Sequence, residues 1–184
     1  MKHVLSHFRF CPHCGSSNFI PNNIKSKRCF DCGFVYYLNP SAACAAIVRE
    51  KGSGRILVAI RANEPAKGMY DLPGGFSDLN ESSEESILRE VAEEISPRLI
   101  EEAGTTLRFL FSRPNLYLYS GMTIPTMDMI YLLEVEDLSP YAGEGRDDVE
   151  SLIALHPDEI DPSKFGFDSI REAFVRYRDM SAKS

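Results

Sequence analysis

The chain has 184 residues, of which 43% are hydrophobic and 26% are charged, and its formal net charge is −7. This length and composition indicate about one folded domain, or one domain with a small appendage, and exclude a disordered chain. No run approaches the roughly 20 apolar residues of a membrane helix. Polar residues and a cysteine stand where a secretory h-region would lie, so the sequence predicts a cytoplasmic protein without a membrane partner.

Charge divides the chain into a basic head and an acidic body. Residues 1–38 hold five Lys and Arg against one acid, Asp31, which gives +4 and leaves −11 for the remainder. The negative total argues against a protein that coats nucleic acid without specificity. We expect a small domain over residues 1–38 and a larger one over residues 39–184.

Four of the five cysteines form two pairs in the head, Cys11-Pro-His-Cys14 and Cys29-Phe-Asp-Cys32, separated by 14 residues and each followed by glycine. Paired hairpins of this kind place four thiolates around one Zn²⁺. The glycines suit a tight turn that aims backbone N–H groups at the sulfurs. Two disulfides are the alternative, but a cytosolic chain keeps its thiols reduced. We expect a zinc-ribbon β-hairpin with structural zinc at Cys11, Cys14, Cys29 and Cys32, and the fifth cysteine, Cys44, as a small buried hydrophobe.

The body begins near Asn39 and combines β-rich runs with two helical stretches. Hydrophobic patterning predicts strands over 42–49, 55–61, 106–111, 116–119, 129–135 and 151–155, and helices over 83–95 and 168–178. The polar segment 51–54 between the first two strands is typical of a hairpin. These elements indicate a mixed α/β body.

The first helix presents three glutamates together. Ser82 and Glu85 are spaced as a capping box, which would start the helix just after a loop. At about 100° per residue, Glu90, Glu93 and Glu94 fall on one side of it, and the apolar residues face a core. Bound Mg²⁺ or Mn²⁺, which favour oxygen ligands, would remove the repulsion among these carboxylates. Taken alone, the pattern also fits a solvated acidic face.

The spacing around this helix resembles the Nudix box, whose pattern is Gly, five residues, Glu, seven residues, then Arg-Glu-apolar-any-Glu-Glu-any-Gly-apolar. The matching positions are Gly75, Glu81, Arg89, Glu90, Val91, Glu93 and Glu94. The chain departs from the pattern at the C-terminal cap of the helix, where Ser96 and Pro97 replace the glycine and the apolar residue. The resemblance implies a Nudix hydrolase with an α/β/α sandwich and a mixed sheet, preceded by the zinc ribbon.

Roles for individual residues also follow from the resemblance. It implies that Mg²⁺ or Mn²⁺ is bound by Glu90, Glu93, Glu94 and a backbone carbonyl of the turn at Gly74 and Gly75. It implies that Glu81 and Arg89 pair and hold the loop to the helix. A further carboxylate often comes from a later loop, for which the candidates are Asp148, Glu150 and, more weakly, Glu144. Each of these three acids is equally explained as an ordinary surface residue.

A four-cysteine ribbon directly before a Nudix domain resembles the NADH pyrophosphatase branch of the family. That branch also carries the segment Ser-Gln-Pro-Trp-Pro-Phe-Pro-any-Ser, of which residues 112–120 keep the two serines, one proline and an aromatic residue. The resemblance implies a pyrophosphatase that cleaves the diphosphate of an NADH-like or ADP-ribose-like molecule. Tyr117 and Tyr119 alternate on a strand and are candidates for stacking on a nucleobase, with strand packing as the alternative.

Two other functions stay open, which are removal of a nucleotide cap from RNA and non-catalytic nucleotide sensing. The intact Arg-Glu and Glu-Glu pairs argue against a sensor, because a binding protein does not need clustered metal carboxylates. Three bases of the ribbon, Lys25, Lys27 and Arg28, form a small patch that could grip RNA. Phe19 and Phe30 could assist them or could pack the hairpin. We favour a structural ribbon that makes a homodimer over one that binds RNA.

Overall fold

The structure is a computed structural model that describes residues 2–119 and 121–182, with the side chain of Tyr119 outside the described residues. The chain divides into two compact units, Met1–Pro40 and Ser41–Ser184. None of the helices in the described residues is both long enough and apolar enough to cross a membrane.

The first unit is a three-stranded antiparallel sheet in the order β1 (Phe19–Asn23), β2 (Ser26–Cys29) and β3 (Val35–Tyr37). The predicted hairpin is therefore extended by a third strand. Its small core consists of two cysteines and four aromatic residues, namely Cys11, Cys29, Phe8, Phe19, Phe34 and Tyr36. The structure corrects the predicted basic patch, because Lys27 is only 7% exposed and its Nζ donates to the Phe8 carbonyl at 2.7 Å.

The second unit contains one mixed sheet in the order β10-β11-β5-β4-β9-β8, with β6 paired to β5 and β7 paired to β4. Its strands are β4 (Ser41–Glu50), β5 (Ile56–Arg61), β6 (Tyr70–Asp71), β7 (Gly74–Phe76), β8 (Thr106–Tyr119), β9 (Met122–Val135), β10 (Gly143–Glu144) and β11 (Val149–Leu155). β4 and β9 are parallel and the other pairs are antiparallel. The helices are α1 (Ser83–Glu94), α2 (Pro97–Glu101) and α3 (Asp168–Ser181), with short 3₁₀ turns at η1 (Ser139–Tyr141), η2 (Pro157–Glu159) and η3 (Pro162–Lys164).

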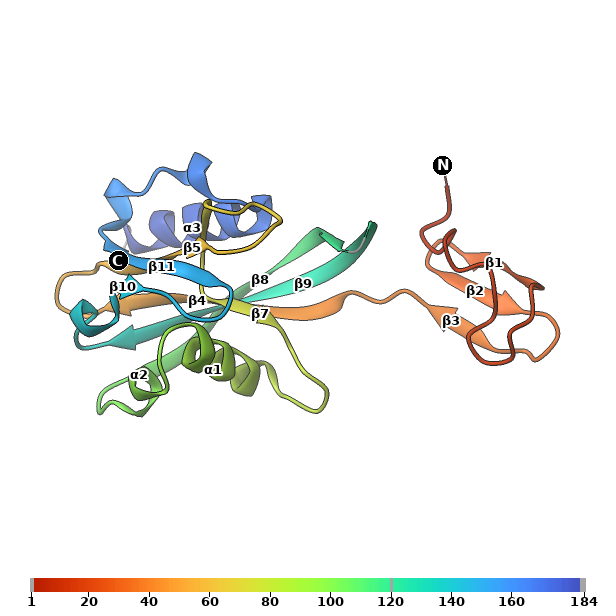
Figure 1. The fold of residues 1–184 in the computed structure, drawn as a ribbon, viewed down its shortest axis with the longest axis horizontal. Coiled ribbons are helices and arrows are strands. Elements are labelled where there is room, and N and C mark those ends of the chain that lie inside the picture. Colours follow the sequence, from red (N-terminus) through yellow and green to blue (C-terminus); the bar gives the residue numbers. More distant parts are fainter. Residues whose placement is uncertain (1, 120, 183–184) are drawn as a thin grey trace. The chain divides into compact units, whose positions relative to one another are not determined.

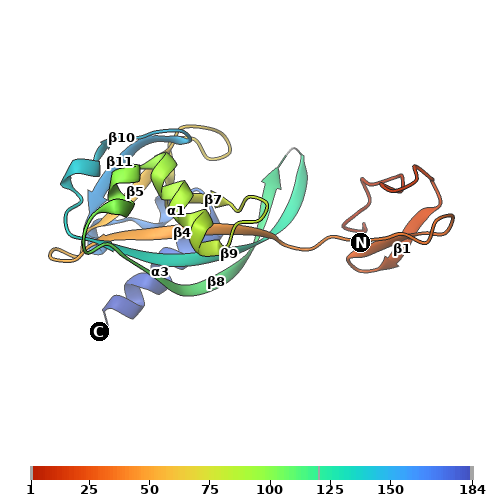
Figure 2. The same ribbon diagram turned by 90° about the horizontal axis from the view of Figure 1, so that it is seen from below.

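Helices cover both faces of this sheet, with α1 and α2 on one face and α3 on the other (Figures 1 and 2). Because successive strand residues point to opposite faces, Ala46 and Val48 of β4 join the core beneath α1, whereas Ala45 and Ile47 join the core beneath α3. Cys44 is 3% exposed, as predicted. A strand buried on both faces explains the small and apolar run in β4, and the mixed α/β/α sandwich predicted from the sequence is confirmed.

β8 and β9 are longer than the sequence predicted. Each has 14 residues, so the expected break near Pro114 does not occur. β8 is an edge strand, where proline removes no hydrogen bond that the sheet needs. The two strands run together beyond the end of the other strands of the sheet (Figure 1). The paired ends of β8 and β9, up to Tyr119 and Met122, therefore lengthen the sheet at one end.

The predicted capping box at the start of α1 is present, with Ser82 and Glu85 bonding each other's backbone N–H groups. At the other end, Ser96 is extended, with φ of −173°, and its hydroxyl accepts from the Arg98 N–H at 3.3 Å. Pro97 is the first residue of α2, a position that proline favours. Ser96 thus caps a second helix, and glycine is not required there.

Candidate active site

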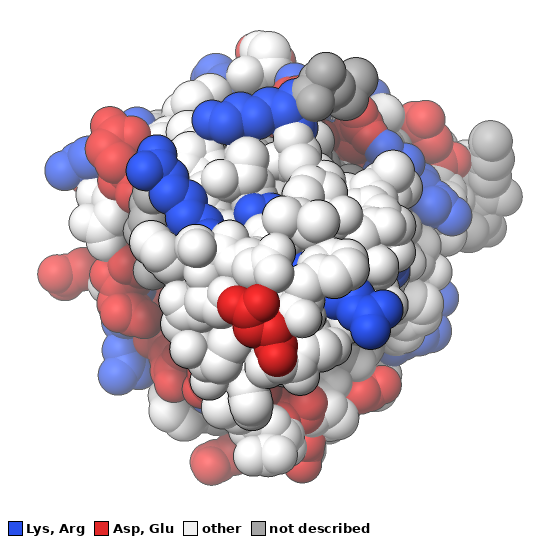
Figure 3. Space-filling view, turned by 90° about the vertical axis from the view of Figure 1, so that its right-hand side faces the viewer, with Lys and Arg blue, Asp and Glu red and all other residues white. Residues whose placement is uncertain are grey.

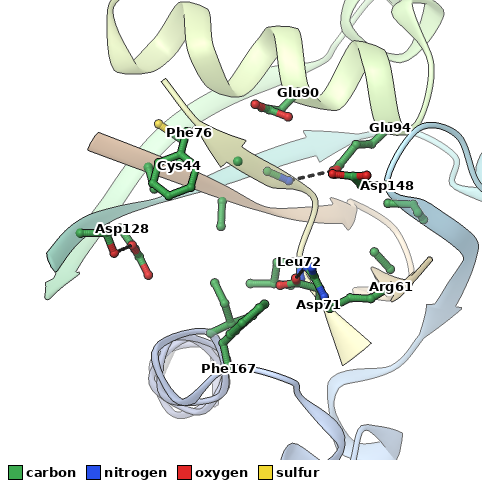
Figure 4. A pocket seen from close by; sticks show the side chains of 18 of the residues that line it. Cys44, Arg61, Asp71, Leu72, Phe76, Glu90, Glu94, Asp128, Asp148 and Phe167 are labelled. Carbon is green, nitrogen blue, oxygen red and sulfur yellow. Dashed lines mark hydrogen bonds and ion pairs between the residues drawn. The ribbon is translucent and has the colours of Figure 1, made fainter. Parts of the chain in front are cut away.

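A cavity of about 340 Å³ opens in the second unit between α1 and the start of α3. Figure 4 shows Glu90 and Glu94 reaching it from α1, and Phe167 at the start of α3 on the opposite wall. Of the residues predicted for the site, it is lined by Gly74, Gly75, Arg89, Glu90, Glu93, Glu94, Asp148 and Tyr117. The structure therefore brings most of the predicted residues to one place.

The two glycines of β7 are required by close contacts. Gly74 has φ of +147°, and a Cβ there would lie 2.7 Å from Ala45 Cα in the paired strand β4. A Cβ on Gly75 would lie 2.7 Å from Glu90 Oε1. Side chains at these positions would displace β4 or the Glu90 carboxylate, so glycine lets α1 approach the turn.

Glu94 is the most deeply placed carboxylate of the box. It is 7% exposed, and the Gly74 N–H donates to its Oε2 at 2.8 Å. Burial, assisted by the negative charges of Glu90, Asp71 and Asp148, raises the pKa of Glu94 to about 8 despite the lowering effect of the Gly74 N–H. The folded protein therefore holds Glu94 in an environment that disfavours its ionised form.

Arg89 joins the loop before α1 to the carboxylates of the helix. Its Nε donates to Glu81 Oε1 at 2.8 Å, and its Nη2 donates to the Phe76 carbonyl at 3.0 Å. Its Nη1 donates to Glu90 Oε1 at 2.9 Å and to Glu93 Oε2 at 3.0 Å. The guanidinium lowers the pKa of Glu81. Arg89 thus holds loop and helix together, which is the pairing with Glu81 that the resemblance implies.

Of the three acids predicted from later loops, one lines the cavity and two do not. Asp148 lines the cavity, and its Oδ1 accepts from Asn63 Nδ2 at 2.7 Å. Glu144 and Glu150 are exposed and do not contribute to the lining. The neighbouring Asp147, which the sequence analysis did not select, also lines the cavity.

A half-buried ion pair in the cavity wall was not predicted from the sequence. Arg61 Nη1 lies 2.6 Å from Asp71 Oδ2, and the guanidinium stacks 4.8 Å from the Phe167 ring centre. Burial raises the pKa of Asp71, although the Arg61 hydrogen bond opposes this effect. Arg61 and Asp71 come from β5 and β6, on either side of a loop, and no local pattern marks them as a pair.

Aromatic side chains form the end of the cavity away from Glu94. The Tyr117 ring lies 5.7 Å from that of Phe76 and 5.5 Å from that of Phe167, measured between centroids. Tyr117 therefore belongs to the cavity wall as well as to its strand. Tyr119, the second predicted stacking residue, has its side chain outside the described residues.

The carboxylate end is chemically suited to divalent cations. Oxygen donors of Glu90, Glu93 and Glu94 gather beside Asp148, and their mutual repulsion contributes to the raised pKa values of Glu90 and Glu94. A bound cation would relieve this repulsion. Arg89 holds the Glu90 and Glu93 carboxylates, and the three glutamates line one end of the cavity without forming a tight ligand cluster among the described residues.

In the first unit, the four predicted cysteines do converge. Their Sγ atoms all lie within 4.8 Å of one another, and all four are free thiols. The nearest pairs, Cys11 with Cys32 and Cys14 with Cys29, are 3.7 Å apart. Gly15 and Gly33 have φ of 76° and 78°, and the backbone amides that follow them bond the sulfurs of Cys14 and Cys32. This cluster can hold one metal ion.

Comparison with known proteins identifies the family. The family model described as "NUDIX domain" matches residues 38–176. The chain therefore belongs to the Nudix family, as the sequence predicted. The chain is 31% identical over 180 residues to the NAD-capped RNA hydrolase NudC of Chromobacterium violaceum, covering 95% of this chain and 61% of that protein. It is 41% identical over 88 residues to the human mitochondrial NAD(P)H pyrophosphatase NUDT13, covering 47% of this chain and 24% of that protein.

The fold has close counterparts among solved structures. A Nudix hydrolase from Nitrosomonas europaea superposes with a TM-score of 0.65 at 21% identity, covering 93% of this chain and 90% of that one. The chain spans less than two thirds of the length of the two named curated relatives. The predicted resemblance to the branch that contains NADH pyrophosphatases is confirmed by these relatives.

The raised pKa of Glu94 predicts how stability depends on pH when no divalent cation is added. Between the ordinary pKa of 4.5 and the folded value of about 8, the unfolded chain ionises Glu94 while the folded chain does not. Glu94 therefore lowers stability progressively as pH rises through this window, by roughly 5 kcal/mol at most. We expect Glu94→Gln to match the wild type near pH 4.5 and to exceed it near pH 8. Urea denaturation in chelator at several pH values measures this difference, and parallel curves for the two proteins would contradict it.

Proposed function

We propose that the protein is a metal-dependent Nudix pyrophosphatase that hydrolyses the diphosphate of an NADH-like or ADP-ribose-like molecule. The observation that carries the proposal is the buried Glu94 at the end of α1, beside Glu90, Asp148 and the glycine turn. A purely structural acid would not be buried among other acids without a cation partner. The cavity is within the size range of nucleotide-binding pockets.

Roles are assigned to residues at the carboxylate end. Glu90, Glu93 and Glu94, with a carbonyl of Gly74 or Gly75, would hold Mg²⁺ or Mn²⁺. When bound, these cations neutralise the diphosphate and lower the pKa of the attacking water. Glu81 and Arg89 position the glutamates, because Arg89 bonds Glu90 and Glu93 directly.

Asp148 is the acid from a later loop that we assign to the reaction, as a cation ligand or as an acceptor of the proton of the attacking water. Its Oδ1 is held by Asn63, which fixes the carboxylate at the edge of the cavity. In the reaction, water adds its oxygen to one phosphorus, the bridging oxygen leaves with the other phosphoryl group, and two monophosphates form. For NADH these are AMP and reduced nicotinamide mononucleotide.

The aromatic end of the cavity supports a nucleotide substrate. Phe76, Tyr117 and Phe167 supply ring faces on which a base can stack. The two named relatives are described as acting on NAD-capped RNA and on NAD(P)H. These descriptions favour a substrate that contains a dinucleotide over a nucleoside triphosphate.

Removal of an NAD-type cap from RNA is the second candidate. The relative named for NAD-capped RNA favours it, and Arg28 lies over the exposed Phe30 ring at 5.7 Å in the ribbon. The ribbon nevertheless carries its Lys and Arg side chains apart from one another, with mostly uncharged surface and an acidic side chain between them (Figure 3). Exposed apolar side chains such as Ile24, at 86%, and Phe10, at 62%, fit a protein contact better than a phosphate backbone.

We therefore propose that the ribbon is a structural zinc domain that makes a homodimer. A tetrahedral site with Zn–S bonds of about 2.3 Å has sulfurs about 3.8 Å apart, close to the 3.7 Å of the nearest cysteine pairs. Free thiols at all five cysteines are in keeping with a reducing compartment such as the cytoplasm.

A substrate panel with matched variants tests the catalytic proposal. NADH, NAD, ADP-ribose, a nucleoside triphosphate and an NAD-capped RNA are incubated with Mg²⁺ or Mn²⁺, and the products are identified. We expect NADH or ADP-ribose to yield AMP and a second monophosphate, with Glu94→Gln lowering kcat at least about a hundredfold. Asp148→Asn should lower it too, whereas Glu150→Gln, an acid outside the cavity, should leave it within about twofold. Equal activity of Glu94→Gln and Glu150→Gln would contradict the assignment of Glu94 as a cation ligand in the reaction. A preference for capped RNA that falls steeply with salt would favour the second candidate.

Metal analysis tests the ribbon. Protein purified reduced and without chelator should contain about one zinc per chain, and Cys29→Ser should lose it and unfold the ribbon locally. In sedimentation, we expect the wild type as a dimer and Cys29→Ser as a monomer, with Cys44→Ser as the matched cysteine control. Zinc-free wild-type protein with an ordered ribbon would contradict the metal assignment, and a monomeric wild type would contradict the dimer.

A further inference from the structure

Two buried polar side chains line the cavity without a full set of partners. Asp128 on β9 is 6% exposed, and its Oδ1 accepts from the Thr126 hydroxyl at 2.6 Å. Ser169 in the first turn of α3 is 5% exposed, and its hydroxyl has no hydrogen-bond partner among the described residues. A buried polar group without a partner carries a desolvation cost. Both side chains are therefore placed to form hydrogen bonds with a ligand, which would supply the partners that the protein lacks.

Asp128 lacks a neutralising cation within the part of the chain that the structure describes. Arg113 stands opposite it in the register of β8 and β9, but the Arg113 guanidinium pairs with Glu172 of α3. Thr126 occupies Oδ1, which leaves Oδ2 to accept from a ligand donor. A carboxylate accepts from an amine and repels a carbonyl oxygen or a second carboxylate at the same place.

Asp128 lies away from the carboxylates that are proposed to bind cations. Figure 4 shows Asp128 and Phe167 across the cavity from Glu94 and Asp148, on the side where Phe76 lies. A ligand whose phosphates approach Glu94 would therefore carry its ring toward Asp128. The start of α3 adds donors there, because its N-cap residue, Phe167, makes no side-chain capping bond.

We propose that Asp128 and Ser169 form a subsite that selects a planar ring bearing a primary amine or carboxamide, such as adenine or nicotinamide. The amine donates to Asp128, and the adjacent ring nitrogen or amide carbonyl accepts from Ser169. The rings of Phe76, Tyr117 and Phe167 provide the stacking surface. This inference rests on the proposed function for the identity of the ligand as a nucleotide, and it adds which base or amide the cavity selects.

Direct binding of mononucleotides tests the subsite without requiring turnover. AMP is compared with IMP, and nicotinamide mononucleotide with nicotinic acid mononucleotide, by calorimetry in Mg²⁺. Each pair differs in the amino group that Asp128 would accept. We expect the wild type to bind the amino member of at least one pair about tenfold more tightly than its counterpart. The pair that shows the preference identifies adenine or nicotinamide as the selected ring.

Three variants separate this role from structural and catalytic ones. Asp128→Asn should reduce the preference to within about threefold, because an amide can donate to the oxygen of IMP or nicotinate. Asp158→Asn, an exposed acid on η2, should leave the preference unchanged. Ser169→Ala should weaken binding of the amino member about threefold to tenfold, yet leave the melting temperature equal or higher, since it removes a buried hydroxyl without a partner.

Equal binding within both pairs by the wild type, or no measurable binding of any of the four, would overturn the inference. So would an Asp128→Asn variant that keeps the full preference. If diphosphates are hydrolysed without an amino preference, the subsite fails and the proposed function stands. If the preference is found but no diphosphate is cleaved, the subsite stands and the proposed function fails.

Discussion

The placement of Glu94 against the Gly74 N–H is the constraint on which the carboxylate end depends. The contact requires α1 to lie close to β7, and that closeness in turn requires glycine at positions 74 and 75. It also requires the apolar face of α1, including Val91, to be anchored in the core beneath it. Burial of an acid beside other acids is unfavourable in isolation. We propose that a bound cation restores the balance in this arrangement.

Arg89 compensates part of the repulsion among the carboxylates of α1. It bonds Glu81, Glu90 and Glu93, all on or next to α1, but no bond joins it to Glu94 among the described contacts. The two outer glutamates are thus compensated by a guanidinium, whereas the innermost one is compensated by a single backbone N–H. This asymmetry makes Glu94 the residue whose ionisation is most sensitive to a bound cation.

Local spacing was enough to predict α1, its capping box and the carboxylates, because each depends on residues within about 20 positions of one another. The cysteine cluster was predictable for the same reason. The long β8–β9 pair was not, because Pro114 interrupts the pattern and its tolerance depends on β8 being an edge strand. Likewise, Ser96 is explained only once α2 is seen to begin there.

The far end of the cavity could not be predicted, because its residues come from elements distant in the chain. Asp128 lies on β9, Arg61 on β5 and Phe167 just before α3, and the three meet only through the tertiary fold. One signal was available. Asp128 is a charged residue at an inward position of a strand that is otherwise mostly apolar, and such a residue usually has a functional reason. Among the later acids, Asp148 and Glu150 could not be separated by spacing, since their difference arises from the turn before β11.

Proton release on cation binding tests the central claim most directly. At pH 7, a Glu94 with a pKa of about 8 is mostly protonated in the folded protein, and a cation that takes its carboxylate must displace the proton. Addition of Mg²⁺ to the wild type in weakly buffered solution should release close to one proton per chain, and addition to Glu94→Gln should release almost none. Mg²⁺ binding without proton release, or equal release from both proteins, would contradict the account.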